Sequence, residues 1–80
     1  MPFFLLHHSH RPDECDAAFA AWQGFQSPLR HHHAASTCLA GGHAIWWHVK
    51  ADGIEQALAL LPAFVARRTD PIAVRDIEIP

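Results

Sequence analysis

The sequence predicts an α+β domain whose elements follow the order strand, helix, strand, strand, helix, strand. Two observations support this prediction. Apolar and β-branched runs alternate with segments in which apolar residues recur every three or four positions. Proline and glycine residues separate these runs. The chain has 80 residues with no repeat and no low-complexity linker. We therefore expect one domain that covers residues 1–80.

The first two expected elements are a strand over residues 2–10 and a helix that follows it. The strand should end at Arg11-Pro12, because proline cannot donate a hydrogen bond to a neighbouring strand. Proline and the acidic Asp13 and Glu14 then favour the first turn of a helix that ends near Gly24. Apolar residues recur along this helix at steps of three and four, which indicates an amphipathic face. They are Cys15, Ala18, Phe19 and Trp22.

The middle of the sequence predicts a β-hairpin. Residues 34–40, AASTCLA, predict a short strand, and residues 43–51, HAIWWHVKA, predict its returning partner. Gly41-Gly42 stands between them as a strong signal for a tight turn. The loop before the hairpin contains the run His31 to His33.

The last third predicts a second helix and a final strand. Asp52 is the expected N-cap, and Glu55 three residues later completes a capping box. The apolar stripe of this helix consists of Ile54, Leu58, Leu61 and Val65. Pro62 should kink or interrupt the helix. Asp70-Pro71 then predicts a turn into a strand over residues 72–79.

This order matches the ferredoxin-like βαββαβ plan, in which a four-stranded antiparallel sheet carries both helices on one face and the first and third strands are central. Both central strands are apolar on both faces. Phe3 and Leu5 point to one face, and Phe4 and Leu6 point to the other. Trp46 points to the face opposite that of Ile45, Trp47 and Val49. Because the helices cover only one face, we expect the other face to pack in a homodimer.

The chain also resembles the small proteins of the dimeric α+β barrel superfamily. The resemblance covers almost the whole length and rests on the element order, on FFLLHHSH before Pro12 and on GGHAIWWHV at residues 41–49. It implies that two ferredoxin-like protomers join through their open sheet faces. Members of the superfamily include cofactor-free monooxygenases, isomerases, polyketide cyclases, heme enzymes and small metal-binding proteins. The fold alone therefore does not select a function.

Composition excludes several classes of partner. The chain has 6 Lys and Arg residues and a formal net charge of −2, which argues against nucleic acid and against a membrane surface. FFLL is too short for a signal sequence or a spanning helix of about 20 residues. The two cysteines, Cys15 and Cys38, lack close spacing. We expect a cytoplasmic protein in which both remain thiols.

Histidine is unusually frequent, with 8 residues in the chain, and its distribution predicts a metal site. His8 and His10 point to the same side of the first strand, because alternate strand residues share a face. In the expected topology His43 lies beside this strand end, so three imidazoles converge. Imidazole suits Zn, Cu and Ni, and a thiolate from Cys38 would favour softer ions. His48 is a further candidate ligand.

Other residues are expected in a pocket or an interface. His7 points away from His8, and His33 lies in the loop. One of Trp46 and Trp47 should pack under the helices, and the other should face a pocket or the dimer partner. The residues also allow ordinary structural roles. A histidine at a strand end often bonds a carbonyl or faces water, and Cys15 on the helical stripe suits the core.

Two functions remain open at this point. The first is a histidine-rich homodimer that binds a transition metal for sequestration, delivery or sensing. The second is a cofactor-free enzyme of isomerase, cyclase or monooxygenase type. It would use a histidine as general acid or base in an aromatic-lined cavity, on a small apolar substrate. The high number of histidines favours metal binding, since one acid/base pair requires fewer histidines.

Overall fold

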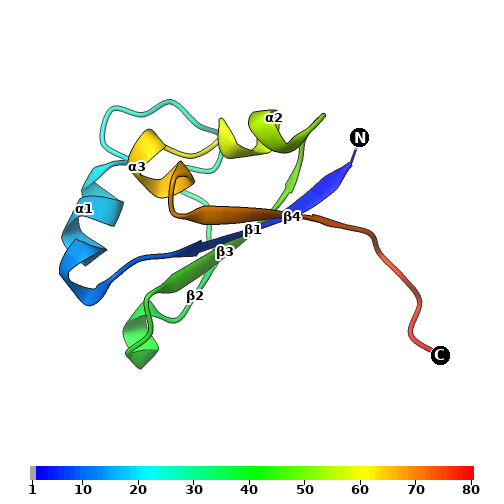
Figure 1. The fold of residues 1–80 in the computed structure, drawn as a ribbon, viewed down its shortest axis with the longest axis horizontal. Helices are drawn as coiled ribbons and strands as arrows, with labels where there is room; N and C mark the ends of the chain where they lie inside the picture. Colours follow the sequence, from blue (N-terminus) through cyan, green and yellow to red (C-terminus); the bar gives the residue numbers. More distant parts are fainter. Residues whose placement is uncertain (1) are drawn as a thin grey trace.

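The structure is a computed structural model that describes residues 2–80, so Met1 of the expected domain lies outside the described residues. It has an α+β fold with one four-stranded antiparallel sheet in the order β2-β3-β1-β4 (Figure 1). The strands are β1 (Phe3–Ser9), β2 (Ala35–Ser36), β3 (Ala44–Lys50) and β4 (Thr69–Val74). The helices are α1 (Cys15–Ala20), α2 (Ile54–Leu58) and α3 (Ala63–Ala66), with short 3-10 helices η1 (Pro12–Glu14) and η2 (Cys38–Ala40).

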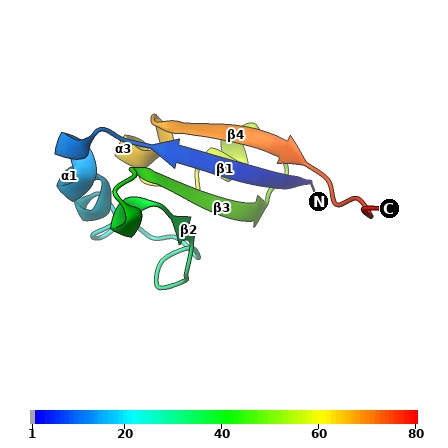
Figure 2. The same ribbon diagram turned by 90° about the horizontal axis from the view of Figure 1, so that it is seen from below.

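The two apolar strands β1 and β3 form the centre of the sheet, as the sequence predicts. They run antiparallel with Leu6 opposite Trp47 and Ser9 opposite Ala44. The helices lie on one side of the sheet, and a view from below shows the opposite face without a helix (Figure 2). We call this opposite side the open face.

Alternation along the strands determines which side chains enter the core. Phe4 and Leu6 of β1 and Val49 of β3 are buried toward the helices. They join residues from the helical segments in one cluster of buried apolar side chains. Those residues are Ala51, Ala57, Leu61 and Val65. Among residues 2–80, no helix has the length and apolar composition that crossing a membrane requires.

The expected strand over residues 34–40 was too long, because only Ala35 and Ser36 pair with β3. Thr37 ends the strand: its N–H donates to the carbonyl of Ala44, and its own carbonyl accepts from the N–H of Gly42. Cys38 to Ala40 then form η2. Gly41 closes this turn with a φ of 88°, a conformation that favours glycine. The connection is therefore longer than the expected two-residue turn.

The helices are shorter than their apolar periodicity indicates. The first begins as η1 at Pro12 and ends as α1 at Ala20, with a turn to Gly24. Pro62 interrupts the second helical segment as predicted, so that α2 and α3 are separate. Asp52 is not the N-cap. Gly53 takes that place, because its carbonyl accepts the first helical hydrogen bond from Ala57.

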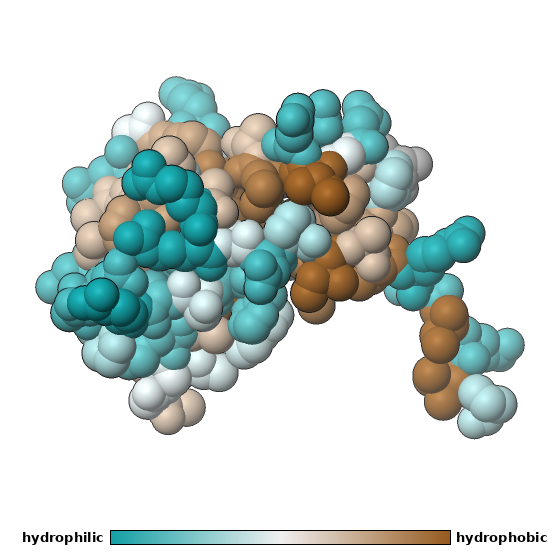
Figure 3. Space-filling view, viewed as in Figure 1, coloured by the Kyte–Doolittle hydropathy of each residue, from teal (hydrophilic) through white to brown (hydrophobic). Residues whose placement is uncertain are grey.

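The last strand lies earlier in the chain than expected. β4 already contains Asp70 and Pro71, because proline is tolerated in a strand at the edge of a sheet. It ends at Val74, opposite Phe3, where the neighbouring strand β1 begins. Residues 75–80 project from the body, and Figure 3 shows apolar side chains exposed along this projection. Ile77 and Ile79 are each 77% exposed.

Candidate metal centre

The end of β1 and the start of β3 bring His10 and His43 together. Since Ser9 lies opposite Ala44, the antiparallel register places His10, which follows Ser9, beside His43, which precedes Ala44. The N–H of His10 donates to the carbonyl of His43 at 3.0 Å. The two imidazole rings lie 5.5 Å apart between centroids. This approach of His10 and His43 follows the prediction from topology.

A tight turn then returns the chain to the same place. Arg11 is extended before Pro12, and its backbone N–H donates to the Glu14 carboxylate at 2.9 Å. The Glu14 N–H in turn donates to the Arg11 carbonyl at 2.9 Å, so two hydrogen bonds close this turn. The next residue, Cys15, begins α1 beside the end of β1. The turn therefore directs a thiol toward the two histidines.

Three potential metal ligands converge at this point. Cys15 Sγ lies 3.2 Å from His10 Nε2 and 3.0 Å from His43 Nδ1. One ligand atom from each residue lies within 4.8 Å of the other two. Nitrogen and sulfur ligands of a tetrahedral zinc ion are roughly 3.5 Å apart. A small outward movement of the side chains would therefore accommodate an ion, and the group could hold one.

His8 fixes the orientation of the His10 ring. The carbonyl of Val65 only accepts hydrogen bonds, so the His8 Nδ1 that lies 3.3 Å away carries the proton. His8 Nε2 is then an acceptor, and His10 Nδ1–H donates to it at 2.8 Å. The remaining nitrogen of His10, Nε2, has a free lone pair that faces Cys15. A metal-binding histidine is usually oriented in this way through its second nitrogen.

Burial keeps the two strand histidines neutral. His8 is fully buried and His10 is 8% exposed. Desolvation lowers the pKa of His8, and the nearby charge of His10 adds to this effect. Desolvation also lowers the pKa of His10, followed by the charge of His43. Both imidazoles therefore keep their lone pairs to a lower pH than an exposed histidine would.

The thiol at this site is protonated when no ion is bound. Desolvation raises the pKa of Cys15, with smaller contributions from Cys38 and Asp16. A bound metal ion binds the thiolate, so coordination must release this proton. Two half-buried ligands, Cys15 and His43, leave the cluster accessible from solvent.

An ion pair between Arg68 and Glu14 holds the turn before Cys15 against the start of β4. Arg68, just before β4, donates through Nη2 and Nε to the Glu14 carboxylate at 2.8 and 3.0 Å. The guanidinium also lies over the Phe64 ring, 3.7 Å from its centroid. Hydrogen bonds from Arg68 hold the pKa of Glu14 below its ordinary value. The pair connects the start of α1 to the end of α3.

The other expected ligands lie elsewhere. His48 is on the open face, where its ring stacks on Phe3 at 5.0 Å, so strand alternation separates it from the cluster. Cys38 is the first residue of η2 and is half-buried. It is close enough to raise the pKa of Cys15 but is not one of the three converging residues. His8 lies beside the cluster and orients His10.

The expected pocket and interface residues fall on both sides of the sheet. His7 and Trp46 stack on the open face with their ring centroids 5.1 Å apart. Trp47 faces the helices and packs against the core. His33 is exposed in the loop, and together with Trp46 and Trp47 it lines a cleft of about 530 Å³.

Cys15 is the member of the cluster that sequence reasoning missed. Its place on the apolar stripe of a helix made it a candidate for the core. The available signal was Glu14, three residues after Arg11, because its carboxylate accepts from the Arg11 backbone N–H and closes the turn that places Cys15 next to the preceding strand end.

Comparison of the chain with models of protein families, with curated proteins and with solved structures finds no match. The function is therefore argued from the geometry of the site.

Proposed function

We propose that this protein binds a single transition-metal ion through His10, Cys15 and His43. The observation that supports this proposal is the convergence of two imidazoles and a thiol within 4.8 Å. The orientation of His10 by the buried His8 also supports it, because the free nitrogen of His10 faces the thiol. Sequestration, delivery or sensing of the metal is the corresponding role.

The ligand set favours zinc or copper over nickel. Thiolate is a soft ligand that suits Zn²⁺ and Cu⁺, and imidazole suits both metals. Three protein ligands leave a fourth tetrahedral position for water or for a ligand from another molecule. An open position suits transfer of the metal better than permanent structural binding. A cytoplasmic location belongs to the same proposal, since a reducing compartment keeps Cys15 and Cys38 as thiols.

A homodimer with the ferredoxin-like arrangement of the dimeric α+β barrel superfamily completes the proposal. The central position of β1 and β3 supports it, as does the apolar content of the open face. Phe3, Leu5 and Trp46 are only half-buried there in the single chain. Covering a large apolar side chain contributes about 1.5 to 3 kcal/mol.

Metal titration of protein purified without a tag tests the site. Co²⁺ serves as a spectroscopic probe for zinc, because thiolate coordination gives a charge-transfer band. We expect one ion per chain, with this band lost in Cys15→Ser. His10→Gln and His43→Gln should weaken Zn²⁺ binding by at least about tenfold. His33→Gln, in the exposed loop, is the matched control and should bind as the parent does. Equal effects at all these positions, or no binding by the parent, would refute the proposal.

A second candidate is the cofactor-free enzyme with a histidine acid or base. It is favoured by a cleft between α1, the loop and β3, in which His31 and His32 stand beside Trp22 and Trp47. Elemental analysis of tag-free protein separates the two candidates. A stoichiometric transition metal supports the first, and metal-free protein that retains this cleft supports the second.

A further inference from the structure

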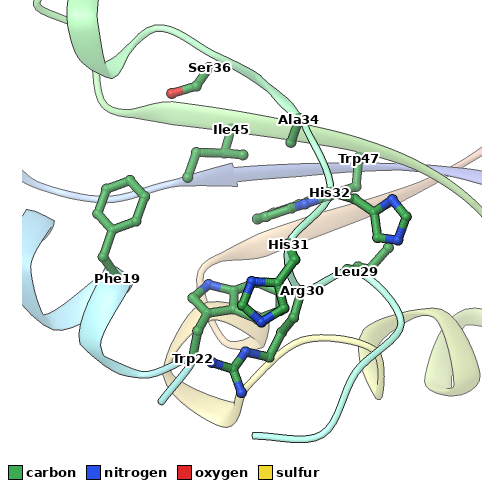
Figure 4. Close-up of a pocket in the computed structure, with 10 residues that line it drawn as sticks. All are labelled: Phe19, Trp22, Leu29, Arg30, His31, His32, Ala34, Ser36, Ile45 and Trp47. Atoms are coloured by element: carbon green, nitrogen blue, oxygen red, sulfur yellow. The ribbon is translucent and has the colours of Figure 1, made fainter.

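The cleft between α1, the loop and β3 has a mostly apolar interior. Its volume is about 370 Å³, within the range of small-molecule sites. Phe19 extends into it from α1, and Ile45 and Trp47 extend from β3 (Figure 4). Trp22 completes the wall, with its ring 5.8 Å from that of Trp47. Such aromatic surfaces favour a flat apolar ligand.

The polar lining of the cleft consists of the neutral Ser36 and three basic side chains. Arg30, His31 and His32 line it from the loop, and the lining contains no Asp or Glu. The ion pairs among residues 2–80 use Arg11 and Arg68, not Arg30. Arg30 is half-buried, and its guanidinium makes one long hydrogen bond of 3.4 Å to the Phe25 carbonyl. No second hydrogen bond of this guanidinium is found among residues 2–80, so its remaining N–H groups can bind a ligand.

The loop that carries these basic residues has an unusual backbone conformation at His31. His31 has a φ of 67°, the one positive φ among the non-glycine residues of the described chain. Non-glycine residues rarely adopt this conformation, and such strained positions cluster at ligand-binding sites. The loop is also fixed to the helical layer, because the Ser27 hydroxyl donates to the Leu60 carbonyl at 2.7 Å. The loop that carries the basic residues is therefore held in place by a hydrogen bond to the helical layer.

We infer that this cleft binds a small planar aromatic carboxylate. The rings of Trp22 and Trp47 contact the flat apolar part, and Arg30 pairs with the carboxylate. A guanidinium matches a carboxylate with two parallel hydrogen bonds, which a neutral ligand cannot reproduce. None of the three converging metal ligands lines the cleft, so this inference does not rest on metal binding.

Calorimetry with 1-naphthoate, its neutral amide and acetate tests the inference. We expect naphthoate to bind about tenfold more tightly than the amide, because a charge-assisted hydrogen bond is lost, and acetate not to bind. Arg30→Gln should reduce naphthoate affinity to that of the amide and leave amide binding unchanged. Arg75→Gln, on the projecting C-terminal segment, is the matched control. His31→Asn retains a residue that tolerates positive φ and should weaken naphthoate binding less than Arg30→Gln does.

Nuclear magnetic resonance locates the ligand independently. Naphthoate should shift the indole N–H signals of Trp22 and Trp47 but not that of Trp46, which lies on the open face. The titration is run with chelator and again with zinc, and binding should persist in both. Equal affinity for naphthoate and its amide would overturn the inference. The same holds for equal effects of Arg30→Gln and Arg75→Gln, or for absence of binding.

Discussion

His8 controls which nitrogen of His10 is free to bind a metal. Its Nδ1–H points to the Val65 carbonyl, and the Thr69 hydroxyl donates to the same carbonyl at 2.7 Å. The Thr69 oxygen therefore also has an acceptor site toward His8, 3.4 Å away. His8 is left with one acceptor, which receives the His10 proton. In the proposed metal site, a residue outside the three converging side chains thus positions one of them.

Replacing His8 should weaken metal binding although the three ligands remain. His8→Leu removes the acceptor for His10 Nδ1–H, and we expect zinc affinity to fall by about 10-fold to 100-fold. His8→Gln, whose side-chain oxygen can accept this hydrogen bond, should recover part of the loss. His7→Leu, on the opposite side of the sheet, is the control. Competition titration with a chromophoric chelator measures each affinity, and an unchanged affinity in both His8 variants would contradict the role.

The thiol predicts how metal affinity depends on pH. The pKa of Cys15 is raised, so the metal-free thiol holds its proton throughout the neutral range. Coordination releases that proton, and zinc affinity should rise about tenfold per pH unit between about pH 7 and pH 8.5. At lower pH it should fall more steeply once His10 protonates, and because burial lowers the pKa of His10, this steeper fall begins below the ordinary histidine range. In Cys15→Ser the slope near neutrality should nearly vanish. A parent protein with flat affinity over this range would contradict thiolate coordination.

Sequence reasoning predicted that His10 and His43 lie side by side but not that Cys15 converges with them. Antiparallel register is a property of strand order, so it places His10 beside His43 once β1 and β3 are neighbours. The position of Cys15 depends on the path of a four-residue turn. Apolar periodicity describes the faces of a helix but not the location of its first residue in space. The convergence of Cys15 therefore requires the turn geometry.

At the scale of elements, the ends of the strands depend on which residues of an adjacent strand are present to pair with them, and the sequence alone does not show this pairing. The alternation of apolar and acidic residues over 72–79 resembles a strand, yet pairing stops at Val74 because β1 offers no partner beyond Phe3. Residues 34–40 contain small side chains that suit a strand or a 3-10 turn equally. Long strands such as β1 and β3 were predicted well because apolar residues on both of their faces leave a strong pattern in the sequence.

The Glu14 and Arg68 pair should stabilise the junction of α1 and α3 only when the carboxylate is ionised. The folded pKa of Glu14 is below its ordinary value, so this stabilisation is complete above that value and disappears as the pH falls through the folded pKa. Glu14→Gln should therefore lower the urea midpoint at about pH 7 but not near pH 2.5.

The neighbouring Asp16→Asn, at an exposed position of α1, is the matched control. It should leave the midpoint near that of the parent at both pH values. If Glu14→Gln loses the same stability at both pH values, ionisation of the carboxylate is not the cause.

At the scale of the whole molecule, the sheet has two unlike faces. One is covered by helices and forms the core. On the other, two aromatic pairs stack, and the Lys50 ammonium lies 5.1 Å from the centroid of the Phe3 ring. Ile72 is 44% exposed beside them. An 80-residue chain buries only about 60% of its unfolded surface, so covering this face would add substantially to its stability.

Sedimentation at micromolar concentration tests the homodimer. We expect a dimer for the parent and a monomer for Trp46→Glu, because a carboxylate in the centre of the open face would be buried without a partner. Leu39→Glu changes a fully exposed residue of η2 and should remain dimeric. A monomeric parent would contradict the expected packing of the open faces.

A metal ion bound at this site would also form a reversible cross-link between distant parts of the chain. Cys15 and His43 are 28 positions apart in sequence, and an ion that joins them closes a loop containing the turn after α1 and the edge strand β2. Closing a loop removes chain entropy that the metal-free protein retains in its opened states. Chelation should therefore accelerate amide hydrogen exchange between residues 15 and 43, measured by mass spectrometry. Exchange at the far end of the sheet, where Phe3 pairs with Val74, should change much less.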